Sequence, residues 1–319
     1  MKVFNIAIIG AGQLGSRHLQ GLKLSKLHSN IWVIDNSVES LMVAQQRYEE
    51  GGQNLNQVVI YDNSYDSLQQ EIDLVIIATS SKPRLSILKD LLSKVKVSYI
   101  VLEKFLFTGL ADYEEAKKLL DNKGVKAWVN CPRRLFDYYH QIDSIIDKAR
   151  PTEIQYADVN WGLCCNSIHM IDIFMMLSGQ QSYQADFSGV EPTVIESKRN
   201  GYIEFNGTIK IQTPNSSTLT LCCMDKVDNK GLIIITNGKN HIVLDESNKV
   251  MFIKGKEYPI CMKYQSQLTG LVADEILQNG TCQLTTFYES SEYHKVFLTG
   301  ILDVYNKITG EIHDRCPIT

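Results

Sequence analysis

Apolar runs and amphipathic stretches alternate along the first 130 residues. The apolar runs are short and rich in Val and Ile, which is typical of buried parallel strands. They lie at 4–9, 30–34, 58–61, 73–79, 99–102 and 126–129. The stretches between them predict helices at 13–24, 38–50, 67–70, 84–93 and 111–122. Six strands with intervening helices predict an α/β domain built on a doubly wound parallel sheet.

The pattern changes near residue 130. Two helices are expected around one strand, at 138–149, 154–161 and 168–177, and the second helix ends at Gly179. Alternating strands are expected at 207–212, 218–221, 232–236 and 241–244, followed by helices at 267–278 and 290–307. Consecutive strands joined by short turns predict an α+β domain with an open, mostly antiparallel sheet. We therefore expect domains at 1–129 and 130–319.

The first strand runs directly into Gly10-Ala11-Gly12-Gln13-Leu14-Gly15 and then a helix. In such a turn Gly10 permits the tight bend, Gly12 lets the backbone approach a pyrophosphate, and Gly15 allows close packing. The helix N-terminus presents unpaired N–H groups to the phosphates. This context predicts a Rossmann-type dinucleotide site, with cofactor contacts at Gly10, Gly12, Gln13, Leu14 and Gly15.

An acidic residue follows the second strand at the spacing expected for ribose recognition. Asp35 lies 20 residues after Gly15, where its carboxylate can accept hydrogen bonds from the ribose hydroxyls. The same carboxylate repels a 2′-phosphate, and Asn36 and Ser37 bring no cation for one. The sequence therefore predicts NAD(H) rather than NADP(H). The alternative is a solvated aspartate at a strand end.

Polar residues also follow the fourth and fifth strands. Thr79 and Ser80 follow one, and Glu103 and Lys104 end the other. Ligands of open parallel sheets bind beyond the carboxyl ends of the strands, so these four residues are expected beside the glycine turn. We predict that Thr79, Ser80 and Glu103 contact the cofactor; for Thr79 and Ser80 a loop-capping role is the alternative.

Composition restricts the class of protein. The 319 residues have a formal charge of −4 and 44% hydrophobic residues, and no basic stripe stands out, which argues against nucleic acid as a partner. No apolar run has the length of a membrane span and no leader precedes the first strand, so we expect a cytoplasmic protein without a membrane partner. The eight cysteines lack metal-ligand spacing; we expect buried thiols and no metal.

With these motifs in place, the chain resembles the Gfo/Idh/MocA oxidoreductases (glucose–fructose oxidoreductase, inositol dehydrogenase and relatives). The resemblance covers nearly the whole chain and rests on a small set of motifs. They are Gly10-Ala11-Gly12-Gln13-Leu14-Gly15-Ser16-Arg17-His18, Ala78-Thr79-Ser80, Glu103-Lys104, Asn130-Cys131-Pro132-Arg133-Arg134 and His169-Met170-Ile171-Asp172. It implies that Lys104 and His169 are catalytic and handle the proton of a substrate hydroxyl. A positioned Lys or His suits this task, because oxidation of an alcohol releases one proton with the hydride.

Two positions depart from the family pattern. Phe105 follows Lys104 where the family has proline, so a cis bond there is expected to be costlier. Cys165 stands where the family's aspartate is expected, four residues before His169. Cys165 and the neighbouring Asn166 are candidate substrate residues, although Cys165 is also explained as a small buried residue. Arg134 is a further substrate candidate at the domain junction, with an interdomain salt bridge as the alternative.

The resemblance implies an NAD(H)-dependent dehydrogenase or reductase. Its substrate would carry the secondary hydroxyl or ketone of a sugar, sugar acid, cyclic polyol or activated sugar. The alternatives are a glycosidase that retains NAD and a non-catalytic NAD-binding sensor or regulator. The apolar strands 219–223 and 232–235 indicate a sheet covered on both faces, so we expect a homodimer or homotetramer through the C-terminal sheet. Pairing within one larger sandwich is the alternative.

Overall fold

A computed structural model describes residues 2–50 and 52–319, and the chain divides into two units. The first unit comprises Met1–Phe107, Ala111–Pro132 and Lys263–Phe287, and the second comprises Thr108–Leu110, Arg133–Met262 and Tyr288–Thr319. Both units are therefore assembled from separated segments. The segment 263–287 lies with the first unit, whereas the expected division at 129 and 130 assigns it to the second. That the first domain binds the cofactor and the second binds the substrate stays a prediction.

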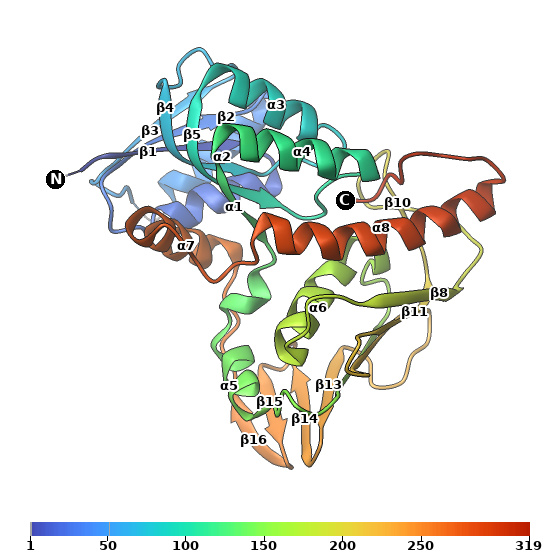
Figure 1. Ribbon diagram of the computed structural model, residues 1–319. Helices are drawn as coiled ribbons and strands as arrows, with labels where there is room; N and C mark the ends of the chain where they lie inside the picture. The colour runs from blue at the N-terminus through green and yellow to red at the C-terminus, as the bar shows by residue number, and fades with distance from the viewer. Residues whose placement is uncertain (1, 51) are drawn as a thin grey trace. The chain divides into compact units, whose positions relative to one another are not determined.

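The first unit contains a six-stranded parallel sheet in the order β3-β2-β1-β4-β5-β6, as the sequence predicts. The strands are β1 (Phe4–Ile9), β2 (Ser29–Ile34), β3 (Gln57–Asp62), β4 (Glu71–Ile77), β5 (Lys96–Glu103) and β6 (Lys126–Asn130). The helices are α1 (Gln13–Leu22), α2 (Val38–Glu49), α3 (Arg84–Lys94), α4 (Leu110–Lys123) and α7 (Gln265–Asn279), of which α4 begins with a residue of the second unit. Figure 1 shows α3 and α4 on one face of the sheet and α1 and α7 on the opposite face.

The central strands of this sheet are apolar at their carboxyl ends. β1, β4 and β5 carry four consecutive buried residues at their carboxyl ends, because helices cover both faces of the sheet there. The helix expected at 67–70 is wrong, since these residues form a turn. Four residues make too little helix to offset nucleation, and the carboxylate of Asp62 accepts from the backbone N–H groups of Asn63 and Ser64 just before it.

The second unit contains an eight-stranded sheet in the order β16-β15-β14-β13-β7-β12-β11-β8. β7 and β12 pair in parallel and the other neighbours are antiparallel, so the expected mostly antiparallel sheet is confirmed. The strands are β7 (Thr152–Asp158), β8 (Gln184–Val190), β11 (Gly207–Gln212), β12 (Thr218–Cys223), β13 (Leu232–Asn237), β14 (Asn240–Asp245), β15 (Val250–Ile253) and β16 (Lys256–Pro259). A two-stranded sheet pairs β9 (Ile195–Glu196) with β10 (Ile203–Glu204).

The helices of the second unit are η1 (Pro132–Leu135), α5 (Asp137–Ile145), α6 (Leu163–Ser178) and α8 (Phe287–Thr309), of which η1 and α8 each begin with a residue of the first unit. Helix α6 contacts β7 and β12, and twelve of its sixteen residues are buried. It is longer than the expected 168–177 and begins at Leu163, after the N-cap residue Gly162, which has a φ of +79°. The predicted end at Gly179 is confirmed, because this residue is left-handed.

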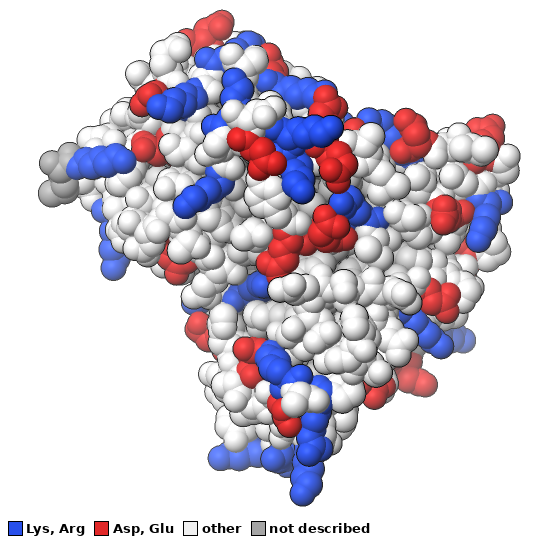
Figure 2. Space-filling view, in the orientation of Figure 1, with Lys and Arg blue, Asp and Glu red and all other residues white. Residues whose placement is uncertain are grey.

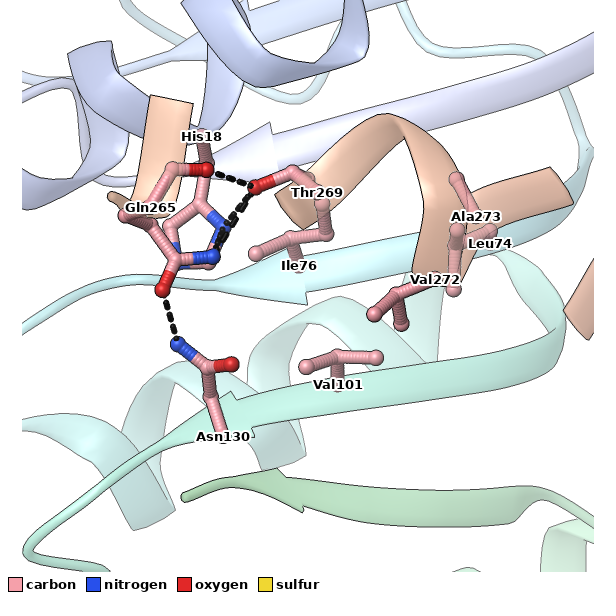
Figure 3. Close-up of a pocket in the computed structure, with 9 residues that line it drawn as sticks. All are labelled: His18, Leu74, Ile76, Val101, Asn130, Gln265, Thr269, Val272 and Ala273. Atoms are coloured by element: carbon pink, nitrogen blue, oxygen red, sulfur yellow. Dashed lines mark hydrogen bonds between the residues drawn. The ribbon is translucent and has the colours of Figure 1, made fainter. Parts of the chain in front are cut away.

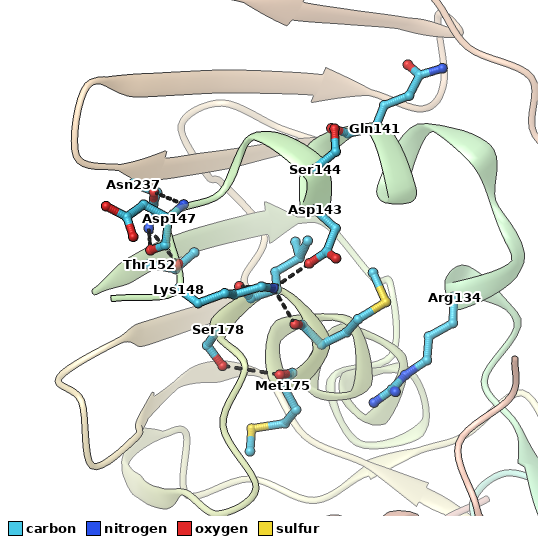
Figure 4. A network of polar contacts seen from close by, with 12 residues as sticks. Arg134, Gln141, Asp143, Ser144, Asp147, Lys148, Thr152, Met175, Ser178 and Asn237 are labelled. Atoms are coloured by element: carbon cyan, nitrogen blue, oxygen red, sulfur yellow. Dashed lines mark hydrogen bonds and ion pairs between the residues drawn. The ribbon is translucent and has the colours of Figure 1, made fainter. Parts of the chain in front are cut away.

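A polar network fixes the C-terminal end of α6 (Figure 4). The Lys148 ammonium donates to the carbonyl oxygens of Met176 and Leu177, both at 2.8 Å, and pairs with Asp143 of α5. Unpaired carbonyls and the partial negative charge at a helix C-terminus both favour such a cation. Nearby, buried Asn237 accepts from the N–H of Asp147. These contacts hold α6, which carries His169, from its far end.

Candidate functional site

The glycine turn has the geometry of a dinucleotide cradle. A Cβ built on Gly15 lies 1.7 Å from the carbonyl oxygen of Gly10, so only glycine permits this approach of α1 to β1. Gly10 has a φ of +95°, and a Cβ there meets Thr79 at 3.0 Å. A Cβ on Gly12 meets nothing within 4 Å, and Gly12 is exposed. The space in front of Gly12 and the N-terminus of α1 therefore fits a pyrophosphate.

Asp35 is oriented by the turn that it faces. Its carboxylate accepts hydrogen bonds from the N–H of Ala11 at 2.6 Å and from the N–H of Ser37 at 2.8 Å. The two donors fix the carboxylate at the end of β2, directly beside the glycine turn. A half-buried acceptor held in this place suits recognition of ribose hydroxyls.

Arg47 contacts the residues that follow the glycine turn, and the sequence gave no indication of it. From α2 its guanidinium donates to the side-chain oxygen of Gln13 at 2.7 Å and to the hydroxyl of Ser16 at 2.5 Å. The first turn of α1 is thus tied to α2. Gln13 is exposed and Leu14 is half-buried, so the structure places both at the mouth of the cradle.

Thr79 and Ser80 lie in the same loop region, after β4. The buried hydroxyl of Thr79 has no hydrogen-bond partner among the described residues, and Thr79 packs against Gly10. A buried hydroxyl without a protein partner is costly and fits a site that a ligand completes. The described structure therefore brings the glycine turn, Asp35, Thr79 and Ser80 to the carboxyl edge of one sheet.

Buried Arg84 joins the loops after β4 and β5. Its guanidinium donates to the carbonyl oxygen of Thr79 in one loop and to those of Phe105 and Leu106 in the other, the last at 2.8 Å. Arg84 is 1% exposed. Lys104, half-buried, comes directly before this anchored segment, and its peptide bond to Phe105 is cis. The sequence marked Lys104 but gave no indication of Arg84, because the bonds join separate loops.

Glu103, expected at the cofactor, is 3% exposed and joins a buried polar cluster, of which His18 and Asn130 are drawn in Figure 3. Its carboxylate accepts from Nε2 of His18 at 2.9 Å and from the side-chain amide of Asn130. Burial by itself raises the pKa of Glu103, but the hydrogen bond and charge of His18, the Asn130 amide and the charge of Lys104 together lower it. The carboxylate is therefore held ionised, and its contact with the cofactor stays a prediction.

In the second unit, α6 carries the other predicted residues. His169 is half-buried one turn after Cys165, and the side-chain amide of Asn166 donates to the carbonyl oxygen of Trp161. A carboxylate does lie at the start of α6, but it belongs to Glu204 of β10. It accepts from the N–H groups of Cys164 at 2.7 Å and Cys165 at 3.0 Å. Sequence reasoning missed Glu204, since it lies in a two-residue strand 39 positions away.

Arg134 is committed to ion pairs within the second unit. Its Nε is 2.9 Å from Asp172 of α6, which is fully buried, and its Nη2 is 3.6 Å from Glu289 of α8. Burial by itself lowers the pKa of Arg134, but the charges of Asp172 and Glu289 raise it overall. The observed ion pairs of Arg134 join residues of one unit, unlike the interdomain salt bridge given as the alternative, and a substrate contact stays a prediction.

The described residues were compared with what a metal site, a disulfide and a membrane-spanning helix require. No group of three or more metal-ligating side chains occurs in 2–50 and 52–319. None of the eight cysteines, all in described positions, forms a disulfide. The expectation of buried thiols is confirmed for Cys131, Cys164, Cys223 and Cys316. It is wrong for the other four, because Cys165, Cys222 and Cys282 are half-buried and Cys261, in a loop after β16, is exposed. In the same part of the chain, no helix combines the length and hydropathy that crossing a bilayer requires.

Comparison with known families tests the motifs directly. Residues 4–131 match the model of GFO_IDH_MocA, described as an oxidoreductase family with an NAD-binding Rossmann fold. This segment belongs to the Gfo/Idh/MocA oxidoreductase family. The match spans the glycine turn, Asp35 and Lys104, and its description gives this segment an NAD-binding Rossmann fold. No curated protein sequence matches the chain.

Solved structures with similar folds span nearly the whole chain. An oxidoreductase from Agrobacterium radiobacter, in complex with NAD+, L-tartaric acid and magnesium, has 13% identity and a TM-score of 0.70, covering 96% of this chain and 99% of its own. The UDP-N-acetylglucosamine 3-dehydrogenase GnnA from Acidithiobacillus ferrooxidans has 14% identity and a TM-score of 0.68, covering 94% and 97%. A super-repressor mutant of Gal80p from Saccharomyces cerevisiae has 13% identity and a TM-score of 0.69, covering 97% of each chain. At these identities the likeness shows the two-part Gfo/Idh/MocA fold.

Proposed function

We propose that the protein is an NAD(H)-dependent dehydrogenase or reductase. Its substrate carries a secondary hydroxyl or ketone in a sugar, sugar acid, cyclic polyol or activated sugar. The observation that carries the proposal is Lys104 at the carboxyl edge of the sheet that holds the glycine cradle, within a segment of an oxidoreductase family. The GnnA dehydrogenase and the tartaric acid complex support the substrate class by similarity of fold.

In this proposal the main cofactor and catalytic residues have separate physical tasks. The open backbone at Gly12 and the N–H groups of α1 bind the pyrophosphate, and Asp35 accepts from the ribose hydroxyls. The nicotinamide, when bound, accepts or donates the hydride. Lys104 Nζ takes the hydroxyl proton in oxidation and returns it in reduction, and His169 holds the same hydroxyl.

The choice of NAD over NADP rests on Asp35. Two backbone N–H groups hold its carboxylate beside the glycine turn, where a 2′-phosphate would meet a fixed negative charge. Asp35→Ser should therefore weaken the binding of NAD and increase the affinity for NADP relative to that for NAD. Titration of both cofactors with both proteins measures this change, and unchanged preference would contradict the assignment.

The proposed reaction is tested with purified protein, NAD and NADP, and a panel of polyols, sugars, sugar acids and nucleotide sugars. Turnover with NAD should fall by roughly 100-fold or more in Lys104→Ala, because general acid–base groups contribute about that much. Lys94→Ala is the matched control, since Lys94 is half exposed on α3 and pairs with Asp90. Equal turnover by both variants would remove Lys104 from the mechanism.

A regulatory role is the second candidate. Gal80p, whose super-repressor mutant shares the fold, and Cys165 in place of the family's aspartate favour it. A regulator would bind NAD without turning over any member of the panel. Cofactor binding with no chemistry across all four substrate classes would support this role over the dehydrogenase.

We also propose a homodimer or homotetramer through the sheet of the second unit. Helices bury one face, and on the other face Phe252, Val243 and Ile234 are half-buried neighbours across β15, β14 and β13. A row of apolar residues on an open sheet fits a second copy of the chain. Light scattering of the native protein and of Val243→Lys tests this oligomer, and a monomeric native protein would exclude it.

A cytoplasmic location of the protein stays a prediction.

A further inference from the structure

A polar cluster lies buried in the first unit, beneath the loop that carries Lys104. Besides its bond to Glu103, His18 of α1 contacts the Thr269 hydroxyl of α7 through Nδ1, at 3.0 Å. Gln265 of α7 donates to Thr269 at 2.9 Å and accepts from Asn130 of β6 at 2.8 Å (Figure 3). His18 is 1% exposed and Glu103 3%. Five side chains from four elements thus satisfy one another, and all but the half-buried Gln265 are buried.

The direction of the central bond is fixed by chemistry. An ionised carboxylate only accepts, so Nε2 of His18 carries the proton that faces Glu103 whichever state Nδ1 adopts. A buried carboxylate needs such donors, since burial without them favours the neutral acid. His18 and Asn130 are the two donors that meet it.

The residues after Lys104 are also held by a buried group. Arg84 binds the carbonyl oxygens of Phe105 and Leu106, so Lys104 lies between two anchored neighbours. Glu103 anchors the chain before it and contributes a fixed negative charge to it. The placement of Lys104 and the electrostatic field around it therefore both depend on the state of the Glu103 carboxylate.

We propose that His18 is a positioning residue for Lys104, acting through the carboxylate that it holds ionised at Glu103. This inference rests on the proposed function of Lys104. Helix α7, which comes from a distant part of the chain, completes the arrangement by holding His18 through Thr269. The groups that face Glu103 are His18 from α1, Asn130 from β6, the neighbouring Lys104 and, through Asn130 and His18, the polar pair of α7.

Two amide variants of His18, which differ in how far the amide reaches, separate this role from a packing role. In His18→Gln the amide reaches the place of Nε2 and keeps a donor for Glu103. In His18→Asn the amide reaches only the place of Nδ1, so the donor is lost while the cluster keeps a polar residue. Urea unfolding of both variants, and of Glu103→Gln, shows that each compared protein is folded.

The first measurement is made without cofactor. Lysines are labelled by 13C-methylation, and the Lys104 signal is assigned as the one missing in Lys104→Arg. In His18→Asn the Glu103 carboxyl should take up a proton at a higher pH than in the native protein, and the Lys104 signal should gain an inflection there. The native protein, His18→Gln and the double variant His18→Asn/Glu103→Gln should show none.

The second measurement is turnover. In His18→Asn kcat should fall by roughly tenfold, as for loss of a supporting residue behind a functional one, with KM for NAD unchanged. His18→Gln should restore most of the native rate. Identical Lys104 titrations in folded His18→Asn and His18→Gln would overturn the proposal. Full activity of Lys104→Ala would overturn the proposed function instead and leave the titration result standing.

Discussion

Arg84 forms several buried hydrogen bonds that its neighbours in the sequence do not predict. Its guanidinium satisfies the carbonyl oxygens of Thr79, Phe105 and Leu106. Arg84→Met should lower the free energy of unfolding by about 3 kcal/mol or more, since each buried acceptor left unpaired costs about 1–3 kcal/mol. Urea unfolding measures this. Arg150→Ala, at an exposed ion pair, should change stability by less than about 0.5 kcal/mol, and equal losses would contradict the role of Arg84.

Glu103 makes stability depend on acid. Its pKa is lowered in the folded protein, so its contribution is fully present above its unfolded value of about 4.3 and is lost as the pH falls through the folded pKa. The stability difference between native protein and Glu103→Gln should shrink below about pH 4.3. Glu71→Gln, at an exposed pair with Lys96, is the control and should show little change with pH. A constant difference for Glu103→Gln from pH 7 to 3 would contradict the ionised state.

At the scale of elements, α1 and α7 cross at two glycines. A Cβ on Gly270 lies 2.7 Å from the carbonyl oxygen of Gly21, and one on Gly21 lies 2.8 Å from that of Gln265. Backbone cannot yield as a flexible side chain does, so Gly270→Ala should destabilise the protein by about 1–3 kcal/mol. Thermal or urea unfolding measures the loss.

Gly12→Ala is the matched comparison for this crossing. Its Cβ meets nothing in the protein, so the unliganded variant should keep its stability within about 0.5 kcal/mol. The same Cβ enters the space assigned to the pyrophosphate, and the Kd for NAD should rise on the order of tenfold or more, about 1.4 kcal/mol. Unchanged NAD binding would place the pyrophosphate elsewhere.

At the scale of the whole molecule, charges of both signs are interspersed over the face shown in Figure 2, in line with a small net charge of −4. A ligand that binds only the folded chain stabilises it by mass action. NAD at 100 times its Kd should add about 2.7 kcal/mol to the free energy of unfolding. NADP at the same concentration should add less, because of Asp35. Differential scanning calorimetry with each cofactor checks this, and equal stabilisation by both would contradict the preference for NAD.

Local pattern was sufficient for the elements and the cradle. Apolar runs, helical spacing and the glycines at 10, 12 and 15 depend on neighbouring residues, so they could be predicted. The mostly antiparallel sheet after residue 150 could also be predicted, but not the parallel pairing of β7 with β12. Short edge strands such as β8 and β16 carry weak alternation and were missed. The sequence by itself therefore determined the fold class and the NAD-binding Rossmann family of residues 4–131, while the residues that contact the cofactor stay predictions.

Only the tertiary structure decided which distant residues meet. It assigned α7 to the first unit, joined His18 to Glu103, placed Arg84 between two loops and set the carboxylate of Glu204 at the start of α6. Each contact links positions far apart in the chain, and no periodicity records them. Buried polar groups find partners wherever the packed elements bring donors and acceptors within reach, and that proximity exists only once the sheets and helices have assembled.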